Sequence, residues 1–384
     1  MRQLDAGLVD LVRDRVSSSG ATPDSDAISA VVRDCGLVLD QAGLVALAQS
    51  LRDELHGLGP LDPLARDPAV TDILVNGPRE VWVDRGRGLV RAQAEFRDEA
   101  AVRQLAIRLA ARAGRRLDDA MPYVDARLPG GERLHAALPP LVVEGTAISL
   151  RIPRRRRFSV EDLIAAGTVD EPGARWLAAL VEARAAFLIS GGTGSGKTTV
   201  LGALLARVPG HERIVVVEDT RELDPQHPHV VNLESRPANV EGVGEIGLRT
   251  LVRQALRMRP DRLVVGEVRG AEVVDMLAAF NTGHEGGCGT VHANSAASVP
   301  DRLVALALAA GMTLAGVHAQ MSAGLEAVVH LARRPDGRRV VTEIGLLAGT
   351  PDGPVVRSAL VREDGRMRAG PAIEQLRLRV GGSP

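Results

Sequence analysis

The feature that most constrains the fold is a glycine-rich segment, GGTGSGKT, at residues 191–198. It fits the pattern G-x-x-x-x-G-K-[ST], follows the apolar run AAFLIS and precedes the helical run TVLGALLARV, the context that a phosphate-binding loop requires. Glycines let successive backbone N–H groups point at phosphate oxygens, and the positive end of the following helix adds attraction. The sequence therefore predicts a nucleoside triphosphate site formed by Gly191, Gly192, Thr193, Gly194, Ser195, Gly196, Lys197, Thr198 and Thr199. Lys197 is expected to reach the β- and γ-phosphates, and the Thr198 hydroxyl is expected to bind Mg²⁺.

Lys197 is the only lysine among the 47 lysine and arginine residues of the chain. A GC-rich genome explains the general preference for arginine. The exception is informative because arginine carries a wide planar fork, whereas lysine carries a compact ammonium on a flexible stem. A lysine kept at this position suggests a cavity that admits only the smaller charge.

The overall charge and the cysteine content exclude several classes of protein. A net charge of -1 gives no global field that attracts nucleic acid. The two cysteines, Cys35 and Cys288, lie far apart, which excludes a cysteine-built zinc site and a disulfide framework and indicates a reducing compartment. The N-terminus lacks the apolar core of a signal peptide, and polar residues and glycines interrupt the uncharged stretch 303–325. We therefore expect a cytoplasmic protein that is not integral to a membrane.

The pattern of apolar residues divides the chain into four parts. Helical spacing predicts a helical N-terminal segment over 1–57, and short strands with one helix near 98–113 predict a small α+β domain over 58–152. The arginine run at 154–157 marks a linker over 153–170. In the last part, 171–384, apolar strands at 185–190, 213–219, 262–268 and 287–293 alternate with helices, which predicts an α/β domain with a buried, mostly parallel sheet. Residues 351–384, rich in Gly, Pro and Arg, are expected to be peripheral and poorly ordered.

Several further segments accompany the phosphate-binding loop in a fixed order. They are RIVVVEDTRELD (213–224), RLVVGEVRG (262–270), GGCGTVHANS (286–295) and, upstream, LGPLDPLARDPAVTDILVNGP (58–78), ARLPGGERLHAALPP (126–140) and ISLRIP (148–153). Together they resemble the type II and type IV secretion ATPases, most closely the branch that powers tight-adherence (Tad, CpaF-like) pili. The resemblance covers about residues 57–350. It implies a RecA-like P-loop NTPase domain behind the smaller α+β domain, with ATP and Mg²⁺ as cofactors.

The same resemblance implies the partners and the location. They are a homo-hexamer, an inner-membrane platform protein and, indirectly, a pilin or secreted substrate, at the inner face of the cell membrane and without nucleic acid. Two alternatives remain open: a nucleic-acid translocase on the same fold, and a regulator that binds ATP without hydrolysing it. The small number of aromatic residues gives few platforms for base stacking, which argues against the translocase.

Three residues at predicted strand ends are candidates for chemistry. Glu267 follows an apolar strand and could orient or deprotonate the attacking water; the alternative is a helix cap or a surface carboxylate. Glu218 could hold Mg²⁺ through water or share the activation of the nucleophile, unless it lies in a solvated loop. For His292 the resemblance implies contact with the γ-phosphate, whereas an isolated histidine of this kind is more often a core residue.

Positive charge against the reacting phosphate is also required, because negative charge develops on its oxygens. The resemblance implies that Arg133 and Arg151, in the small α+β domain, supply part of it. The alternative is that both arginines are solvated strand ends. A residue set of Glu267, Glu218, His292, Arg133 and Arg151 is therefore the predicted catalytic group, with Thr198 and Glu218 as metal-binding candidates.

Overall fold

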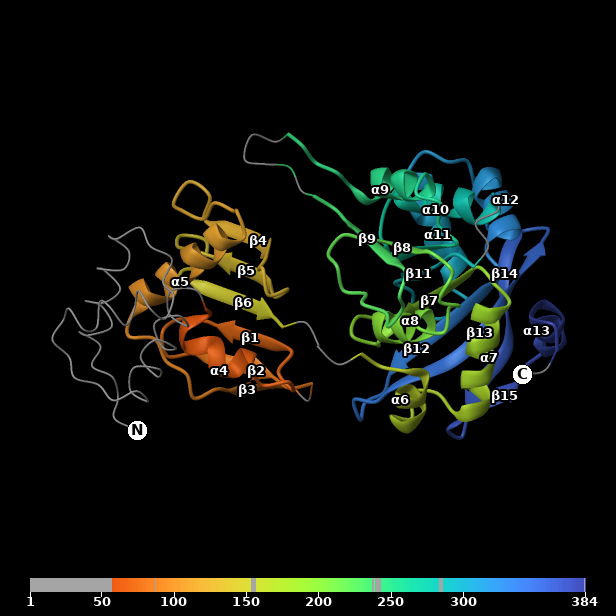
Figure 1. The fold of residues 1–384 in the computed structure, drawn as a ribbon, viewed down its shortest axis with the longest axis horizontal. Coiled ribbons are helices and arrows are strands. Elements are labelled where there is room, and N and C mark those ends of the chain that lie inside the picture. The colour runs from red at the N-terminus through yellow and green to blue at the C-terminus, as the bar shows by residue number, and fades with distance from the viewer. Residues whose placement is uncertain are drawn as a thin grey trace. The chain divides into compact units, whose positions relative to one another are not determined.

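The structure is a computed structural model that describes residues 57–86, 88–152, 157–236, 238, 243–282, 286–382 and 384 (Figure 1). Nearly all of the predicted helical segment over 1–57 lies outside these residues, and so do three of the four arginines of the run at 154–157. The chain divides into two compact units, residues 1–155 and residues 156–384. Each unit is described by itself.

The first unit is a six-stranded antiparallel sheet covered on one face by a helix. The sheet has the order β3-β2-β1-β6-β5-β4. Its strands are β1 (Asp72–Val75), β2 (Val81–Asp84), β3 (Leu89–Arg91), β4 (Tyr123–Arg127), β5 (Arg133–Ala137) and β6 (Ala147–Arg151), preceded by η1 (Gly59–Leu61) and α4 (Asp62–Ala65). The helix α5 (Glu99–Arg112) begins where the side chain of Asp98 accepts a hydrogen bond from the backbone N–H of Ala101. Its apolar side chains pack on the inward-facing residues of the strands, and on β5 the outward-facing residues are the polar Arg133 and His135.

The second unit contains a nine-stranded mixed sheet with the order β15-β14-β13-β12-β7-β11-β10-β8-β9. From β12 to β9 all neighbouring strands are parallel, and from β12 to β15 they are antiparallel. The parallel strands are β7 (Phe187–Gly191), β8 (Ile214–Glu218), β9 (Val230–Glu234), β10 (Arg262–Val268), β11 (Cys288–Val291) and β12 (Ala327–Arg333). The antiparallel strands are β13 (Arg339–Thr350), β14 (Gly353–Glu363) and β15 (Arg366–Ala369). The predicted α/β class with a mostly parallel sheet is confirmed.

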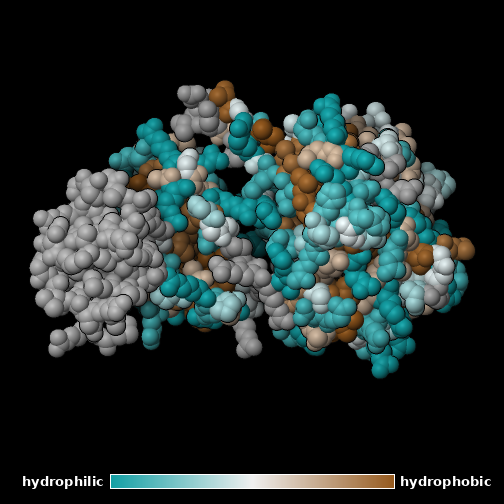
Figure 2. Space-filling model, viewed as in Figure 1, coloured by the Kyte–Doolittle hydropathy of each residue, from teal (hydrophilic) through white to brown (hydrophobic). Residues whose placement is uncertain are grey.

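Helices cover both faces of this sheet (Figure 1). On one face, α6 (Val160–Ala165), α7 (Glu171–Glu182), α8 (Lys197–Leu205) and α13 (Ile373–Val380) pack on alternate strand residues such as Ile214 and Val216. On the other face, α9 (Leu248–Leu256), α10 (Glu272–Asn281), α11 (Val299–Ala309) and α12 (Leu314–Gly324) pack on Val215 and Val217. Because successive side chains enter opposite cores, the central strands are apolar at nearly every position. The visible face of the described residues is mainly hydrophilic, with apolar groups scattered over it (Figure 2).

The expectation for residues 351–384 is wrong. Most of them form β14 and β15, which extend the sheet, and α13, which packs on one of its faces. The guanidinium of Arg379 in α13 lies 2.7 Å from the carboxylate of Glu326 and donates to the carbonyl of Ala183 at 3.1 Å. Arginine and glycine suggest a loop by composition, but here Arg362 in β14 donates to the carbonyls of Thr168 at 3.0 Å and Gly167 at 3.1 Å, and the ion pair fixes the helix. Among the described helices, none has both the length and the apolar character needed to cross a bilayer.

Candidate functional site

The carboxyl ends of four parallel strands bring the candidate residues to one edge of the sheet. Strand β7 ends at Gly191, β8 at Glu218 and β10 at Val268, next to Glu267, and His292 directly follows β11. In open α/β sheets this edge forms the ligand site. The order of the strands places β11 between β7 and β10, so the end of β11 adjoins both the phosphate-binding loop and Glu267.

The predicted phosphate-binding residues form a tight turn and the first turn of α8. Gly191, Gly194 and Gly196 have φ angles of 149°, 69° and 95°, which side chains rarely adopt. A Cβ atom on Gly191 would lie 2.4 Å from the carbonyl oxygen of Leu331, so only glycine fits there. Residues 192–194 are exposed and lie at the amino end of a nine-residue helix. This arrangement suits an anion with several oxygens.

Lys197 is buried at the start of α8, with 8% of its surface exposed. Its ammonium donates to the carbonyls of Gly191 at 3.0 Å and Gly192 at 3.2 Å, and lies 3.4 Å from Nε2 of His292. Burial lowers the pKa of Lys197, and the nearby carboxylate of Glu267 opposes that change. The enclosed position agrees with the interpretation of the sole lysine as a charge held in a small space.

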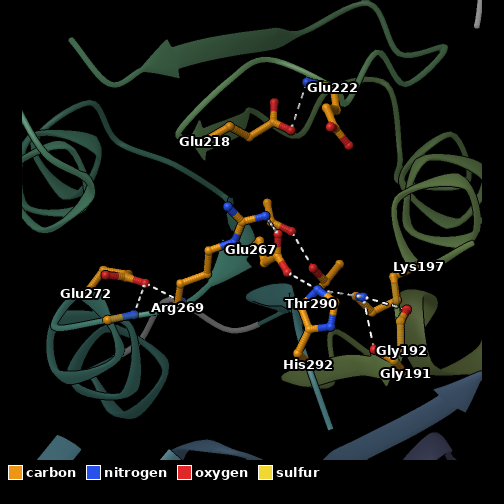
Figure 3. A network of polar contacts seen from close by, with 12 residues as sticks. Gly191, Gly192, Lys197, Glu218, Glu222, Glu267, Arg269, Glu272, Thr290 and His292 are labelled. Atoms are coloured by element: carbon orange, nitrogen blue, oxygen red, sulfur yellow. Dashed lines mark hydrogen bonds and ion pairs between the residues drawn. The ribbon is translucent and has the colours of Figure 1, made fainter. Parts of the chain in front are cut away.

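Glu267, His292 and Lys197 form a polar cluster beside the phosphate-binding loop (Figure 3). Oε1 of Glu267 lies 2.5 Å from Nε2 of His292, and Oε2 accepts a hydrogen bond from Arg269. Oε1 is shielded from solvent, so its close contact with the His292 ring is made away from water. Burial and then the charge of Lys197 lower the pKa of His292, and Glu267 partly offsets them. The cluster thus joins a carboxylate, an imidazole with a lowered pKa and an ammonium.

Glu218 does not join this cluster (Figure 3). Its Oε1 accepts hydrogen bonds from the backbone N–H groups of Glu222 and Leu223, both at 3.0 Å. A Cβ atom on Gly266 would lie 2.4 Å from Cγ of Glu218, so the glycine makes room for this side chain. Burial raises the pKa of Glu218 to about 7. In this arrangement the carboxyl group holds the loop after β8, and its metal-binding and catalytic roles stay predictions.

A Mg²⁺ ion that enters with a nucleotide needs few protein ligands, because Mg²⁺ keeps several waters and is bound largely by phosphate oxygens. Thr198 lies in the first turn of α8, next to Lys197, and its side chain is half-buried. A hydroxyl at this position fits such an ion. The Glu218 carboxylate, in contrast, is already used by two backbone donors.

Arg133 and Arg151 lie in the other compact unit. They are direct partners across strands β5 and β6, and both side chains are exposed on the outward face of the sheet. Within the described part of the chain, neither side chain makes an ion pair or a hydrogen bond, which agrees with solvated strand ends and with groups awaiting an anion. Their predicted role at the phosphate stays a prediction.

Sequence reasoning missed Arg269, whose guanidinium binds Glu267 and whose pKa that contact raises. The signal was available, because residues two apart along an extended segment point to the same side. It also missed Glu272, whose carboxylate accepts from the backbone N–H groups of Arg269 at 2.6 Å and Gly270 at 2.7 Å. Glu272 thereby fixes the turn that carries Arg269.

Comparison with known proteins assigns the family. The family model described as "Type II/IV secretion system protein" matches residues 54–358. A putative conjugal transfer protein of Mycobacterium tuberculosis (strain H37Rv) is 54% identical over 316 residues, which cover 81% of this chain and 90% of that protein. The type IV secretion system protein PtlH of Bordetella pertussis is 33% identical over 325 residues, covering 77% and 95%. The crystal structure of the pilus retraction motor PilT with bound ADP aligns with a TM-score of 0.52 and 21% identity over 82% of this chain and 83% of that one, which shows a common fold. The chain therefore belongs to the type II/IV secretion system protein family.

Proposed function

We propose that this protein is a Mg²⁺-dependent ATPase that powers secretion or pilus assembly. The observation that carries the proposal is the cluster of Lys197, His292 and Glu267 beside the phosphate-binding loop. A protein that only bound nucleotide would need the loop and the ammonium, but not a carboxylate oxygen shielded from solvent and paired with an imidazole beside that ammonium. The family membership supports the same function, because relatives in it are named as secretion and conjugal transfer proteins.

In the proposed reaction, Lys197 exchanges the carbonyls of Gly191 and Gly192 for the β- and γ-phosphate oxygens. Water attacks the γ-phosphorus, its proton passes to Oε1 of Glu267, and ADP leaves with the electron pair of the broken P–O bond. His292, between the ammonium and the carboxylate, would contact the γ-phosphate and respond to its departure. Mg²⁺ would neutralise charge on the phosphates, with Thr198 as its protein ligand.

The finer parts of the proposal rest on the sequence resemblance. They are assembly as a homo-hexamer, docking on an inner-membrane platform protein, a pilin or secreted protein as cargo, and a cytoplasmic position at the inner face of the membrane. The closeness to the Tad branch is also a proposal of this kind, as are the contributions of Arg133 and Arg151 to charge stabilisation and of Glu218 to binding Mg²⁺. The relatives named after type IV secretion and conjugal transfer support a transport system in general.

Phosphate release from ATP by the purified chain tests the function. We expect Mg²⁺-dependent release by the wild-type protein, loss of nucleotide binding in Lys197→Ala, and a Glu267→Gln variant that binds ATP but hydrolyses it about 10²- to 10⁴-fold more slowly. Glu182→Gln, an exposed glutamate on α7, is the matched control for the loss of a carboxylate.

Three results would contradict parts of this proposal. Retention of ATP without any phosphate release would favour the non-hydrolysing regulator. Strong stimulation by single-stranded DNA would favour the translocase. A Glu267→Gln variant that turns over at the wild-type rate would remove this carboxylate from the mechanism.

A further inference from the structure

The hairpin of β12 and β13 runs beside the phosphate-binding loop. Strand β12 pairs in parallel with β7 up to the start of the loop, where His330 is the partner of Ser190 and Leu331 is the partner of Gly191. The chain then turns and returns as β13, with Arg333 and Arg339 as the pair nearest the turn. The end of the hairpin therefore projects past the sheet on the side where the glycine turn begins.

Strand β12 fixes the base of the phosphate-binding loop. Nδ1 of His330 lies 2.9 Å from Oγ of Ser190, and both residues are buried. The carbonyl of Leu331 occupies the space that a side chain on Gly191 would need. These contacts hold the residue that precedes the loop and the first residue of the loop itself.

Arg339 contacts the other end of the loop. Its Nε donates a hydrogen bond to the carbonyl of Gly194 at 2.8 Å. Its Cδ lies 3.1 Å from the position that a Cβ on Gly196 would take, so the aliphatic stem covers this glycine. Gly194 and Gly196 both have positive φ angles, and glycine loses more conformational freedom on ordering than any other residue. The contact with Arg339 thus falls on the most adaptable part of the loop.

The geometry of the peptide group links this contact to phosphate binding. In a planar trans peptide the C=O and the N–H point in opposite directions, so fixing the Gly194 carbonyl also fixes the Ser195 N–H. That N–H points across the turn, toward the carbonyl of Gly192 at 3.3 Å. The positive charge of Arg339, hydrogen-bonded to the Gly194 carbonyl, polarises this peptide group and makes the Ser195 N–H a stronger donor.

We infer that Arg339 is a positioning residue that holds the tip of the phosphate-binding loop, through the Gly194 carbonyl, in the conformation that receives the nucleotide. The inference rests on the nucleotide binding proposed above. Arg339 contacts the loop at the Gly194 carbonyl and over Gly196. Removing it raises the cost of ordering the loop around phosphate, which weakens binding and leaves the groups around Glu267 in place.

The test compares Arg339→Met with Arg338→Met. Methionine keeps an apolar stem over Gly196 but removes the donor and the charge. Arg338, on the same hairpin, is exposed and paired with Asp336, so its variant controls for the loss of one surface charge. The probe is N-methylanthraniloyl-ADP with Mg²⁺, titrated by fluorescence. Hydrogen exchange of the peptide spanning 191–197, without nucleotide, reports the order of the loop.

We expect the dissociation constant to rise about fivefold in Arg339→Met, the value for one hydrogen bond of ordinary strength, and exchange in 191–197 to become faster. In steady-state assays KM for ATP should rise with little change in kcat. Arg338→Met should bind within about twofold of the wild-type protein. Arg339→Lys, which keeps a charged donor on the stem, should recover part of the affinity.

Equal affinity of Arg339→Met and Arg338→Met, with equal exchange of the loop, would overturn the inference. Failure of the wild-type protein to bind the probe would instead refute the proposed nucleotide binding, so the two failures are distinct. If Arg339→Met melts several degrees below the wild-type protein, Arg339→Lys decides the question: a stable lysine variant without recovered affinity would also overturn the inference.

Discussion

Replacing Glu218 with glutamine should change how the stability of the second unit depends on pH. The Glu218 side chain is buried, and burial raises its pKa from 4.5 to about 7. At about 1.36 kcal/mol per pKa unit, the charged form costs about 3 kcal/mol of folding free energy. Because the folded pKa lies above the unfolded one, the favourable contribution is complete below pH 4.5 and is lost as pH rises through 7.

The same argument gives a magnitude for the experiment. Between pH 5.5 and pH 8.5 the wild-type protein should lose about 2 kcal/mol that Glu218→Gln does not lose. The glutamine can keep both hydrogen bonds from the backbone of Glu222 and Leu223, because both donors meet one oxygen. The variant should therefore be more stable than the wild-type protein at pH 8.5 by a larger margin than at pH 5.5.

Urea unfolding at the two pH values measures the difference, because urea carries no charge and does not screen electrostatics. A Trp82→Phe background leaves Trp176, which is buried in α7, as the only tryptophan reporter of the second unit. Glu182→Gln, an exposed glutamate on the same helix, should show no such pH dependence. A stability difference between Glu218→Gln and its background that is the same at both pH values would refute the burial argument.

Three further substitutions should have measurable effects. Lys197→Arg should lose nucleotide binding in a titration although the charge is kept, because the buried site encloses an ammonium; normal affinity would contradict this. Gly266→Ala should lower the free energy of unfolding, measured with urea, by about 1–3 kcal/mol, because the new Cβ would meet Cγ of Glu218. An unchanged free energy would show that Glu218 moves aside without cost. Arg262→Ala should cost about 3–5 kcal/mol in the same assay, because it leaves the buried carboxylate of Glu212 without the partner 2.5 Å away; a loss below 1 kcal/mol would show that Arg184 is sufficient.

The central part of the fold could be predicted because each local pattern agrees with the final structure. The strands β7, β8, β10 and β11 are apolar at nearly every position, which both cores require. The glycine-rich segment predicted a tight turn correctly, because the positive φ angles of that turn need glycine. The proximity of Glu267 and His292 also followed from the sequence, because both stand at the carboxyl ends of parallel strands.

Other parts depended on contacts between distant segments. The antiparallel strands β13–β15 mix buried apolar residues with exposed and half-buried polar ones, without a regular alternation, and the composition of this part of the chain suggests loops. Glu218 ends its strand as predicted. The orientation of its side chain, however, is set by the space at Gly266 and by two N–H groups of the following loop. The contact of Arg339 with Gly194 joins residues 145 positions apart, and nothing in either local sequence indicates the other.

The single lysine also gives the chain one cleavage site for a protease that cuts only after lysine. The bond between Lys197 and Thr198 lies at the start of α8, and the side chain that the protease must recognise is enclosed by the loop. Cutting therefore requires local opening of this turn, and it gives two fragments, 1–197 and 198–384. The rate at which these two fragments appear on a gel therefore reports the local opening of the loop, without any label or introduced residue.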